Sequence, residues 1–188
     1  RLDDYAWRLW DYWERHLDPD LFIDRSLKGK VRNKVVVITG GSSGIGLSTA
    51  QRVAEAGATT IIVARGEEEL FKARDDMKKA GGKVFAYTAD LADMADCDRL
   101  VKTVLDEHGH VDTLISNAGR SIRRSIEASY DRFHDFERTM QLNYFGSIRL
   151  IMGFLPKMTE RRKGHIINIS SIGVLANSPR FSAYVASK

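Results

Sequence analysis

The sequence predicts an α/β fold with a doubly wound parallel sheet of the Rossmann type. From Asn33 onward, short runs of β-branched residues alternate with amphipathic helical stretches, and these runs are apolar enough to be covered on both faces. A glycine-rich segment directly follows the first run and opens the first helix. Strands that alternate with helices form right-handed βαβ units, whose strands lie parallel in one sheet.

The elements follow one another without internal repeats. Strands are expected at 34–39, 59–64, 83–88, 112–116 and 165–170. Helices are expected at 45–56, 67–80, around Cys97–Leu105 and, as one long helix, at 133–158. The first of these helices has a small-residue face that would pack closely on the sheet, formed by Gly46, Ala50, Val53, Ala54 and Gly57.

The last helix would only begin before the sequence stops at Lys188. The fold is therefore expected to be truncated after the fifth strand and the start of the following helix, with the fifth strand at an exposed edge. This piece alone is expected to be weakly active or inactive.

Residues 1–32 differ from the catalytic domain expected at 33–188. Trp7, Trp10 and Trp13 follow one another at a spacing of three, and Asp18-Pro19-Asp20 then breaks the helical pattern. Such an aromatic stripe packs against protein. It fits equally a helical leader that caps its own domain and an interdomain linker that docks on a preceding partner domain.

The composition excludes several classes of protein. With 43% hydrophobic and 29% charged residues, the chain has the composition of a globular protein, and its +4 charge is too scattered to predict nucleic-acid binding. No stretch is long and apolar enough to span a membrane, and no metal-ligand spacing is present. The single cysteine, Cys97, indicates a buried thiol in a reducing, cytoplasmic compartment. His108 and His110 are expected to be solvated.

The glycine-rich segment is the first chemical motif. It runs Thr39-Gly40-Gly41-Ser42-Ser43-Gly44-Ile45-Gly46 between a strand and a helix. Glycines there let the backbone approach a pyrophosphate, which the N-terminus of the helix stabilises. The cofactor contacts predicted from this turn are Gly40, Ser42, Ser43, Gly44, Ile45 and Gly46.

The end of the second strand indicates which dinucleotide binds. NAD enzymes of the Rossmann type have an acidic residue here that bonds the ribose 2′-OH, but this chain has Ala64-Arg65. An arginine can bond a 2′-phosphate, so NADP(H) is favoured over NAD(H). A merely solvated Arg65 is the alternative. Asp90-Leu91 follows the third strand, where Asp90 could also cap the next helix.

Four residues carry the catalytic prediction. Tyr184 and Lys188 are four residues apart and share a helix face, and Ser171 lies thirteen residues before the tyrosine, at the end of the fifth strand. Asn143 begins an N-x-x-G sequence within the long helix. A phenol loses its proton only near pH 10, and a neighbouring ammonium favours the ionised form, so a tyrosine beside a lysine suits acid–base work.

From Thr39 to its end the sequence resembles the short-chain dehydrogenase/reductase family, with its T-G-x-x-x-G-x-G turn and the order and spacing of these four residues. The resemblance implies hydride transfer to a carbonyl with Tyr184 as acid and base, Ser171 orienting the carbonyl, Lys188 bonding the nicotinamide ribose and Asn143 holding a relay water. It also implies that Asp90 bonds adenine and that Leu91 and Tyr184 contact the cofactor. The parent protein is expected to pair subunits through the long helix and the helix that begins near Tyr184.

The segment Ser116-Asn117-Ala118-Gly119 is similar to the family's N-N-A-G sequence, which approaches the cofactor. Ser116 stands where the family has asparagine. A hydroxyl replaces one hydrogen bond of the amide but not the full set, which puts the local geometry in question. Contacts with the cofactor are predicted for Asn117, Ala118 and Gly119.

The substrate is less constrained than the mechanism. Arg120, Arg123 and Arg124 follow the fourth strand and could meet a phosphorylated carrier such as coenzyme A, or form a solvated basic loop. The leader, this loop and the sequences 129–133 and 141–146 resemble the C-terminal reductase module of two-domain bacterial fatty acyl-CoA reductases. That resemblance implies a fatty acyl-CoA or fatty aldehyde substrate. A keto, steroid or lipid reductase of the same fold and a non-catalytic nucleotide-binding or interaction module are the alternatives.

Overall fold

The computed structural model describes residues 5–10, 12 and 26–188. The chain divides between Lys30 and Val31 into two compact units, and a short helix, α2 (Leu27–Val31), spans this division. In the first unit, residues 5–10 are helical, and Trp7 and Trp10 are 72% and 57% exposed. Trp13 and Asp18-Pro19-Asp20 lie outside the described residues. The interpretation of residues 1–32 as a leader or a linker therefore stays a prediction.

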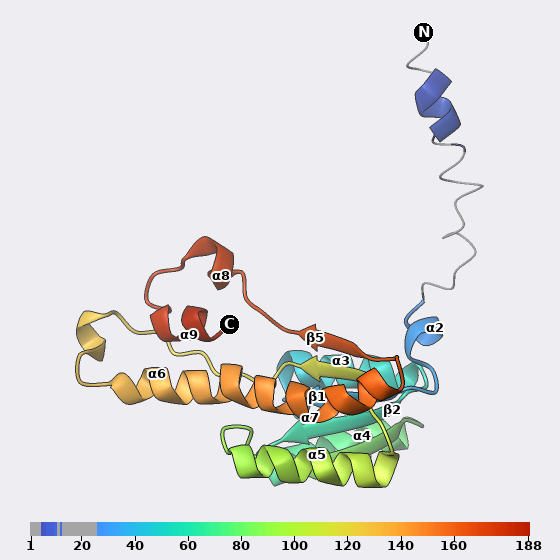
Figure 1. Cartoon of the computed structure of the whole chain (residues 1–188), viewed down its shortest axis with the longest axis horizontal. Helices are drawn as coiled ribbons and strands as arrows, with labels where there is room; N and C mark the ends of the chain where they lie inside the picture. The colour runs from blue at the N-terminus through green and yellow to red at the C-terminus, as the bar shows by residue number, and fades with distance from the viewer. Residues whose placement is uncertain (1–4, 11, 13–25) are drawn as a thin grey trace. The chain divides into compact units, whose positions relative to one another are not determined.

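The second unit is built on a parallel sheet with the strand order β3-β2-β1-β4-β5 (Figure 1). Its strands are β1 (Val35–Thr39), β2 (Thr59–Ala64), β3 (Lys83–Thr88), β4 (Thr113–Ser116) and β5 (His165–Asn168). The predicted doubly wound α/β fold is confirmed, and β5 forms one edge of the described sheet. Because β1 pairs with both β2 and β4, the carboxyl ends of β1 and β4 flank the switch point where such sheets bind ligands.

Helices cover the sheet on both faces. On one face, α3 (Gly44–Glu55) and α4 (Glu67–Lys79) pack against Val36, Ile38 and Ile62. On the other, α5 (Met94–His108) and α7 (Ser147–Glu160) pack against the alternate side chains of the same strands. The predicted small-residue face of α3 is buried except for Gly57, which lies beyond the helix, is exposed and has a φ of +87°.

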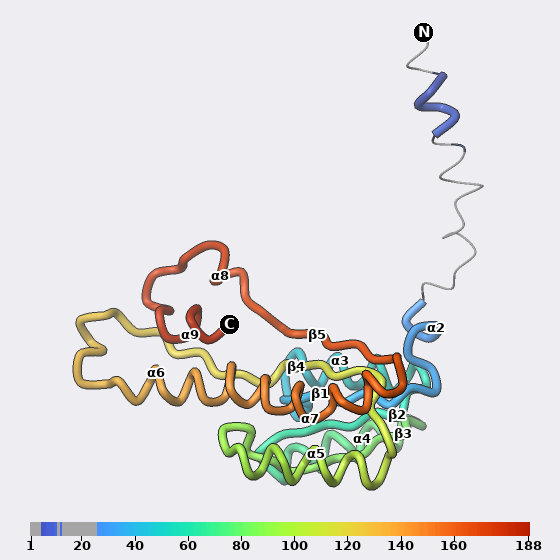
Figure 2. Tube along the Cα trace, viewed as in Figure 1, coloured from blue at the N-terminus to red at the C-terminus, as the bar shows by residue number. Residues whose placement is uncertain are grey.

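The predicted long helix is one rod of three segments (Figure 2). Residues Phe133–Met140 form α6, Gln141–Gly146 form a π-helical turn, and α7 follows directly. Two short elements were not predicted, the 3₁₀ turn η2 (Glu127–Ser129) and α8 (Gly173–Ala176). The predicted last helix is present as α9 (Ser182–Ser187), which contains Tyr184 but ends one residue before Lys188, its C-cap. The loop before α6 lies with α8 and α9 beyond the carboxyl ends of β4 and β5 (Figure 1).

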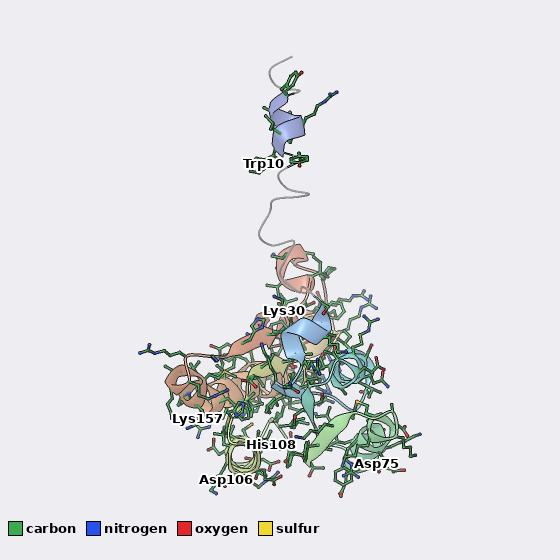
Figure 3. All side chains as sticks on the ribbon, turned by 90° about the vertical axis from the view of Figure 1, so that its right-hand side faces the viewer. Trp10, Lys30, Asp75, Asp106, His108 and Lys157 are labelled. Atoms are coloured by element: carbon green, nitrogen blue, oxygen red, sulfur yellow. The ribbon has the colours of Figure 1, made fainter. Side chains whose placement is uncertain are left out.

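Two sequence predictions about single side chains have opposite outcomes. Cys97 is fully buried, as predicted, and burial raises the pKa of its thiol to about 11. The predicted solvation of His108 and His110 is wrong. His108, labelled in Figure 3, lies 2.8 Å from the Tyr87 hydroxyl and packs edge-on against a phenylalanine ring, and burial lowers its pKa. His110 lies 3.2 Å from a carboxylate oxygen of Asp112.

A buried hydroxyl in β2 gives a stability prediction. Among the described residues, Thr60 Oγ1 is the buried side-chain atom that lacks a hydrogen-bond partner. Thr60→Val should therefore raise the free energy of unfolding by about 1 kcal/mol, because valine keeps the shape and removes an unpaired polar group. Chemical denaturation measures the change, with Thr59→Val in the same strand as the matched control. A less stable Thr60→Val protein would show that the hydroxyl makes a stabilising bond.

Candidate active site

The glycine-rich turn leaves the N-terminus of α3 open. Gly40 and Gly44 have φ angles of +68° and +54°, a left-handed conformation that favours glycine. Ser43 occupies the N-cap position of α3 without a side-chain cap bond, and a Cβ on Gly44 would meet no atom within 4 Å. The first N–H groups of α3 therefore remain available at an open surface. This geometry fits the pyrophosphate of a dinucleotide.

Gly46 brings α3 into close contact with the strand before it. A Cβ at this position would lie 2.1 Å from the carbonyl oxygen of Gly40 and 2.6 Å from Asn117 Nδ2. Neither distance leaves room for a side chain. The predicted glycines thus have two separate roles: Gly44 keeps a surface open, and Gly46 lets helix and strand touch.

Hydrogen bonds join the carboxyl ends of β1 and β4. Thr39 Oγ1 accepts from the backbone N–H groups of Asn117 and Ala118, at 3.0 and 2.9 Å. Asn117 Nδ2 donates to the Thr39 carbonyl at 2.9 Å. Ser116, which departs from the family sequence, hydrogen-bonds the Ser147 hydroxyl at the start of α7. The substitution therefore leaves the end of β4 tied to a helix.

Asn143 is buried in the π-helical turn, and its side chain joins three segments. Oδ1 accepts from Arg120 N at 2.7 Å, and Nδ2 donates to Arg120 O at 2.9 Å. Nδ2 also donates to Ser187 Oγ at 2.8 Å, and that hydroxyl donates to Tyr184 O. The asparagine thus connects the start of the basic loop to the helix that carries the tyrosine.

Lys188 is half-buried beside Asn143. Its Nζ donates to Ile169 O at 2.9 Å, and burial lowers the pKa of the ammonium. A Cβ placed on Gly119 would lie 3.1 Å from Lys188 Nζ and 3.3 Å from Asn143 Oδ1. Both polar atoms therefore flank the same point, which only a glycine leaves free.

Ser171 lies close to Gly173 and to the helix that carries Tyr184. The Ser171 Oγ accepts from Gly173 N at 3.1 Å, which leaves its own proton available to a ligand. A Cβ on Gly173 would lie 3.3 Å from Ser171 Oγ and 3.3 Å from Val185 Cγ2, so the serine adjoins the residue that follows Tyr184. The tyrosine is half-buried, with its ring 6.2 Å from that of Phe181.

Arg65 and Asp90 lie close together after β2 and β3. Arg65 Nη1 is 3.9 Å from Asp90 Oδ2, and the arginine side chain is 79% exposed. Asp90 is not the cap of α5, as one reading of the sequence suggested, because Asp93 accepts from Ala95 N in that role. Asp90 instead accepts from Ala92 N, across Leu91, which is buried.

The three arginines of the basic loop differ in their surroundings. Arg120 and Arg123 are exposed, whereas Arg124 is half-buried and its Nε lies 3.2 Å from Asp135 Oδ2. The charge of Arg124 is therefore engaged within the protein.

Sequence reasoning missed four side chains that hold these segments in place, namely Thr39, Asp135, Ser147 and Ser187. Each is buried or half-buried, and each bonds a residue at least eleven positions away. Their neighbours in the sequence give no signal of these contacts, because the partners lie far away along the chain. Such a residue is usually read as exposed unless its partner is known.

The parallel sheet with a glycine-rich turn at its switch point defines a Rossmann-type domain. Residues 34–188 match the family model described as short chain dehydrogenase, and the chain belongs to this family of oxidoreductases.

Two curated relatives share most of the chain. It is 54% identical over 166 residues to a fatty acyl-CoA reductase of Acinetobacter baylyi, which covers 88% of this chain and 56% of that protein. It is 43% identical over 175 residues to a fatty acyl-CoA reductase of Mycobacterium tuberculosis, which covers 92% of this chain and 60% of that protein. The chain thus spans little more than half the length of these relatives.

Solved structures resemble the fold closely. A metagenomic short-chain oxidoreductase in complex with NADP is 30% identical with a TM-score of 0.80, covering 84% of this chain and 71% of that one. An NAD⁺-bound xylitol dehydrogenase is 28% identical with a TM-score of 0.79, covering 85% and 61%. Neighbours of this fold therefore hold either dinucleotide. None of the described helices combines the length and apolar character needed to cross a membrane.

Proposed function

We propose that the protein is an NADP(H)-dependent reductase that converts a carbonyl group by hydride transfer, with Tyr184 as the acid–base group. One observation carries the proposal. Asn143 and Lys188 adjoin Gly119 after β4, and Ser171 adjoins Gly173 after β5. Ser187 joins the Asn143 side chain to the backbone of Tyr184. In a doubly wound sheet the carboxyl ends of the strands form the edge where a ligand binds.

Each of two hydroxyl groups would have a distinct task. The Ser171 hydroxyl would donate to the substrate carbonyl oxygen and stabilise the negative charge that develops there. The Tyr184 hydroxyl would transfer its proton to that same oxygen. The nicotinamide, when bound, supplies the hydride.

Lys188 and Asn143 would support the tyrosine. The bond to Ile169 O uses one of the three Nζ protons, which leaves the others for the cofactor ribose and for the polar surroundings of Tyr184. Both Nδ2 protons of Asn143 are used by Arg120 O and Ser187 Oγ. Its Oδ1 keeps one acceptor site beside Gly119, where a relay water could connect to Lys188.

The preference for NADP(H) rests on Arg65. The guanidinium is exposed at the end of β2, next to the predicted adenine contact Asp90. A planar guanidinium can bond a 2′-phosphate with two hydrogen bonds. The NADP-bound relative supports this choice, and the NAD⁺-bound one is the reason to test it.

Arg65→Asp should raise the KM for NADPH by about tenfold or more and change the KM for NADH far less, because a carboxylate repels the 2′-phosphate but can accept from a 2′-OH. Steady-state kinetics with both cofactors measures the change. Arg52→Asp, exposed near the other end of α3, controls for the same change in net charge. An equal loss with both cofactors would mean that Arg65 does not select between them.

The proposed substrate is a fatty acyl-CoA or a fatty aldehyde. Support comes from the names of the two bacterial relatives and from the exposed Arg120 and Arg123, which suit the phosphates of coenzyme A. A ketone or alcohol is the second candidate, because the NAD⁺-bound neighbour is named a xylitol dehydrogenase.

The test is NADPH oxidation by the protein at its full natural length with palmitoyl-CoA, hexadecanal and a simple ketone. Turnover of palmitoyl-CoA or hexadecanal supports the first substrate class, and turnover of the ketone alone supports the second. No turnover with any of them, despite NADPH binding, would favour a nucleotide-binding module over an enzyme.

The proposal also covers the domain organisation, the oligomeric state and the cellular compartment. Residues 33–188 would form the catalytic domain, with residues 1–32 as leader or linker to a partner domain. Exposed apolar side chains along α7, including Ile148 and Met152, support a homo-oligomer through this helix. The single cysteine, Cys97, supports a reducing, cytoplasmic setting.

A further inference from the structure

Asp135 is the one buried acidic side chain among the described residues, with 5% of its surface exposed. It lies in the first turn of α6, outside the four proposed catalytic residues. A buried carboxylate is costly unless it is paired and hydrogen-bonded. The groups that pair with the Asp135 carboxylate therefore indicate its role.

Basic side chains surround this carboxylate. Arg132 Nε and Arg124 Nε reach the same oxygen, Oδ2, at 3.0 and 3.2 Å, and His134 Nε2 lies 3.3 Å from Oδ1. The hydrogen bond from Arg132, with the charges of Arg132 and Arg124, holds the pKa of the Asp135 carboxyl below its usual range. Arg124 and Arg132 belong to the loop that follows β4, so the carboxylate anchors that loop to α6.

Arg124, which pairs with Asp135, also bonds the segment before α9. The backbone N–H of Arg124 donates to the carbonyl of Arg180 at 2.8 Å. Arg180 has a φ of +70°, a conformation uncommon for a residue with a side chain, and it precedes Tyr184 by four residues. Asp135 thus holds Arg124, and Arg124 in turn bonds the chain that leads into the tyrosine helix.

The other end of the loop is fixed by Asn143. Its side chain bonds both the N–H and the carbonyl of Arg120. Between the two anchors the loop presents Arg120 and Arg123, which are exposed. Arginines are useful to a phosphorylated substrate only when the backbone that carries them is held in place.

We propose that Asp135 is a positioning residue that fixes the loop of residues 120–132 against the segment before α9, so that its exposed arginines bind the phosphates of a coenzyme A thioester. The substrate part of this inference rests on the proposed function. Asp135 itself touches no substrate. It acts through Arg124 and Arg132.

The experiment compares Asp135→Asn with Asp131→Asn, an exposed residue of the same loop that loses the same charge. In the full-length protein, Asp135→Asn should raise the KM for palmitoyl-CoA by about tenfold, with kcat and the KM for hexadecanal changed less than about twofold. Hexadecanal carries no phosphate, so its reduction measures the chemical step independently of phosphate binding by the loop arginines. Asp131→Asn should match wild type with both substrates.

Hydrogen exchange separates this inference from the proposed function. The amides of residues 121–132 and 177–183 should exchange at least about fivefold faster in Asp135→Asn than in Asp131→Asn, whatever the substrate proves to be. Unchanged exchange would overturn the positioning role even if the enzyme reduces acyl-CoA. Faster exchange with equal losses toward both substrates would overturn the link to phosphate binding. Wild-type protein that turns over neither substrate would refute the proposed function alone.

If Asp135→Asn does not fold, Arg124→Gln replaces it, because that change breaks the loop contact and leaves Asp135 paired with Arg132 and His134. It should give the same KM increase and the same faster exchange. An increase in KM without faster exchange would show that Arg124 contacts the substrate directly, which contradicts the positioning role.

Discussion

A Tyr184→Phe protein is expected to lose about 10²–10⁴-fold in kcat for carbonyl reduction while keeping its affinity for NADPH. The change removes only the hydroxyl that would give its proton to the carbonyl oxygen. The ring stays, and so does its packing at 6.2 Å from Phe181. Ser187 still donates to the backbone carbonyl at position 184, so the link to Asn143 is unaffected.

Single-turnover NADPH oxidation measures the chemical step, and cofactor fluorescence measures binding. Tyr130→Phe is the matched control, since Tyr130 is 80% exposed and lies in the loop between β4 and α6. A variant at position 184 that keeps more than about a tenth of wild-type kcat would exclude the phenol as the proton donor. A parallel loss of NADPH affinity would instead indicate a structural role for the hydroxyl.

The strands could be predicted because each of them depends on residues that are neighbours in the sequence. A buried parallel strand needs an uninterrupted apolar run, and each such run is bounded by polar or glycine residues. β2 and β3 match their predicted ranges, and the other strands differ by one or two residues at an end. The strand order could not be obtained in this way, because every β-branched run suits any place in a covered sheet.

The long helix contains a feature that neighbouring residues do not predict. Its periodicity continues through residues 141–146, yet the backbone there widens into a π-helical turn. The contacts of Asn143 in this turn are with Arg120 and Ser187, which lie 23 and 44 positions away. A conformation associated with partners so distant leaves no trace in the spacing of apolar residues.

In the candidate site, the sequence predicted the reactive side chains but not the residues that support the segments around them. Its reactive side chains were found from their spacing in the sequence, because Lys188 follows Tyr184 by four residues and Ser171 precedes it by thirteen. In the structure, α9 ends at Ser187 with Lys188 at its C-cap, and β5 ends three residues before Ser171. The residues that hold the neighbouring segments in place, such as Ser187 and Asp135, look like ordinary surface residues in sequence. Their burial is a consequence of tertiary contacts, and so is the engagement of Arg124, which the sequence grouped with the exposed arginines.

Gly46→Ala is expected to lower the free energy of unfolding by about 3 kcal/mol, the upper range for forcing a methyl group into packed structure. The added Cβ would lie 2.1 Å from the carbonyl oxygen of Gly40, a backbone atom that cannot rotate away. Relief requires α3 to move off β1, against the contacts of Ala50 and Val53 with the sheet. Chemical denaturation measures the loss, with Ser48→Ala on the exposed side of α3 as the control.

Gly44→Ala, two residues earlier, is expected to behave differently. Its Cβ would enter open space, so the stability cost should be only the roughly 1 kcal/mol of a left-handed backbone. That open space is where a pyrophosphate would approach the N-terminus of α3, so NADPH affinity should fall by about tenfold or more. Titration of NADPH fluorescence measures the affinity. If Gly44→Ala binds NADPH as wild type does, the cofactor does not approach this turn, and the dinucleotide part of the proposal is wrong even though the fold is right.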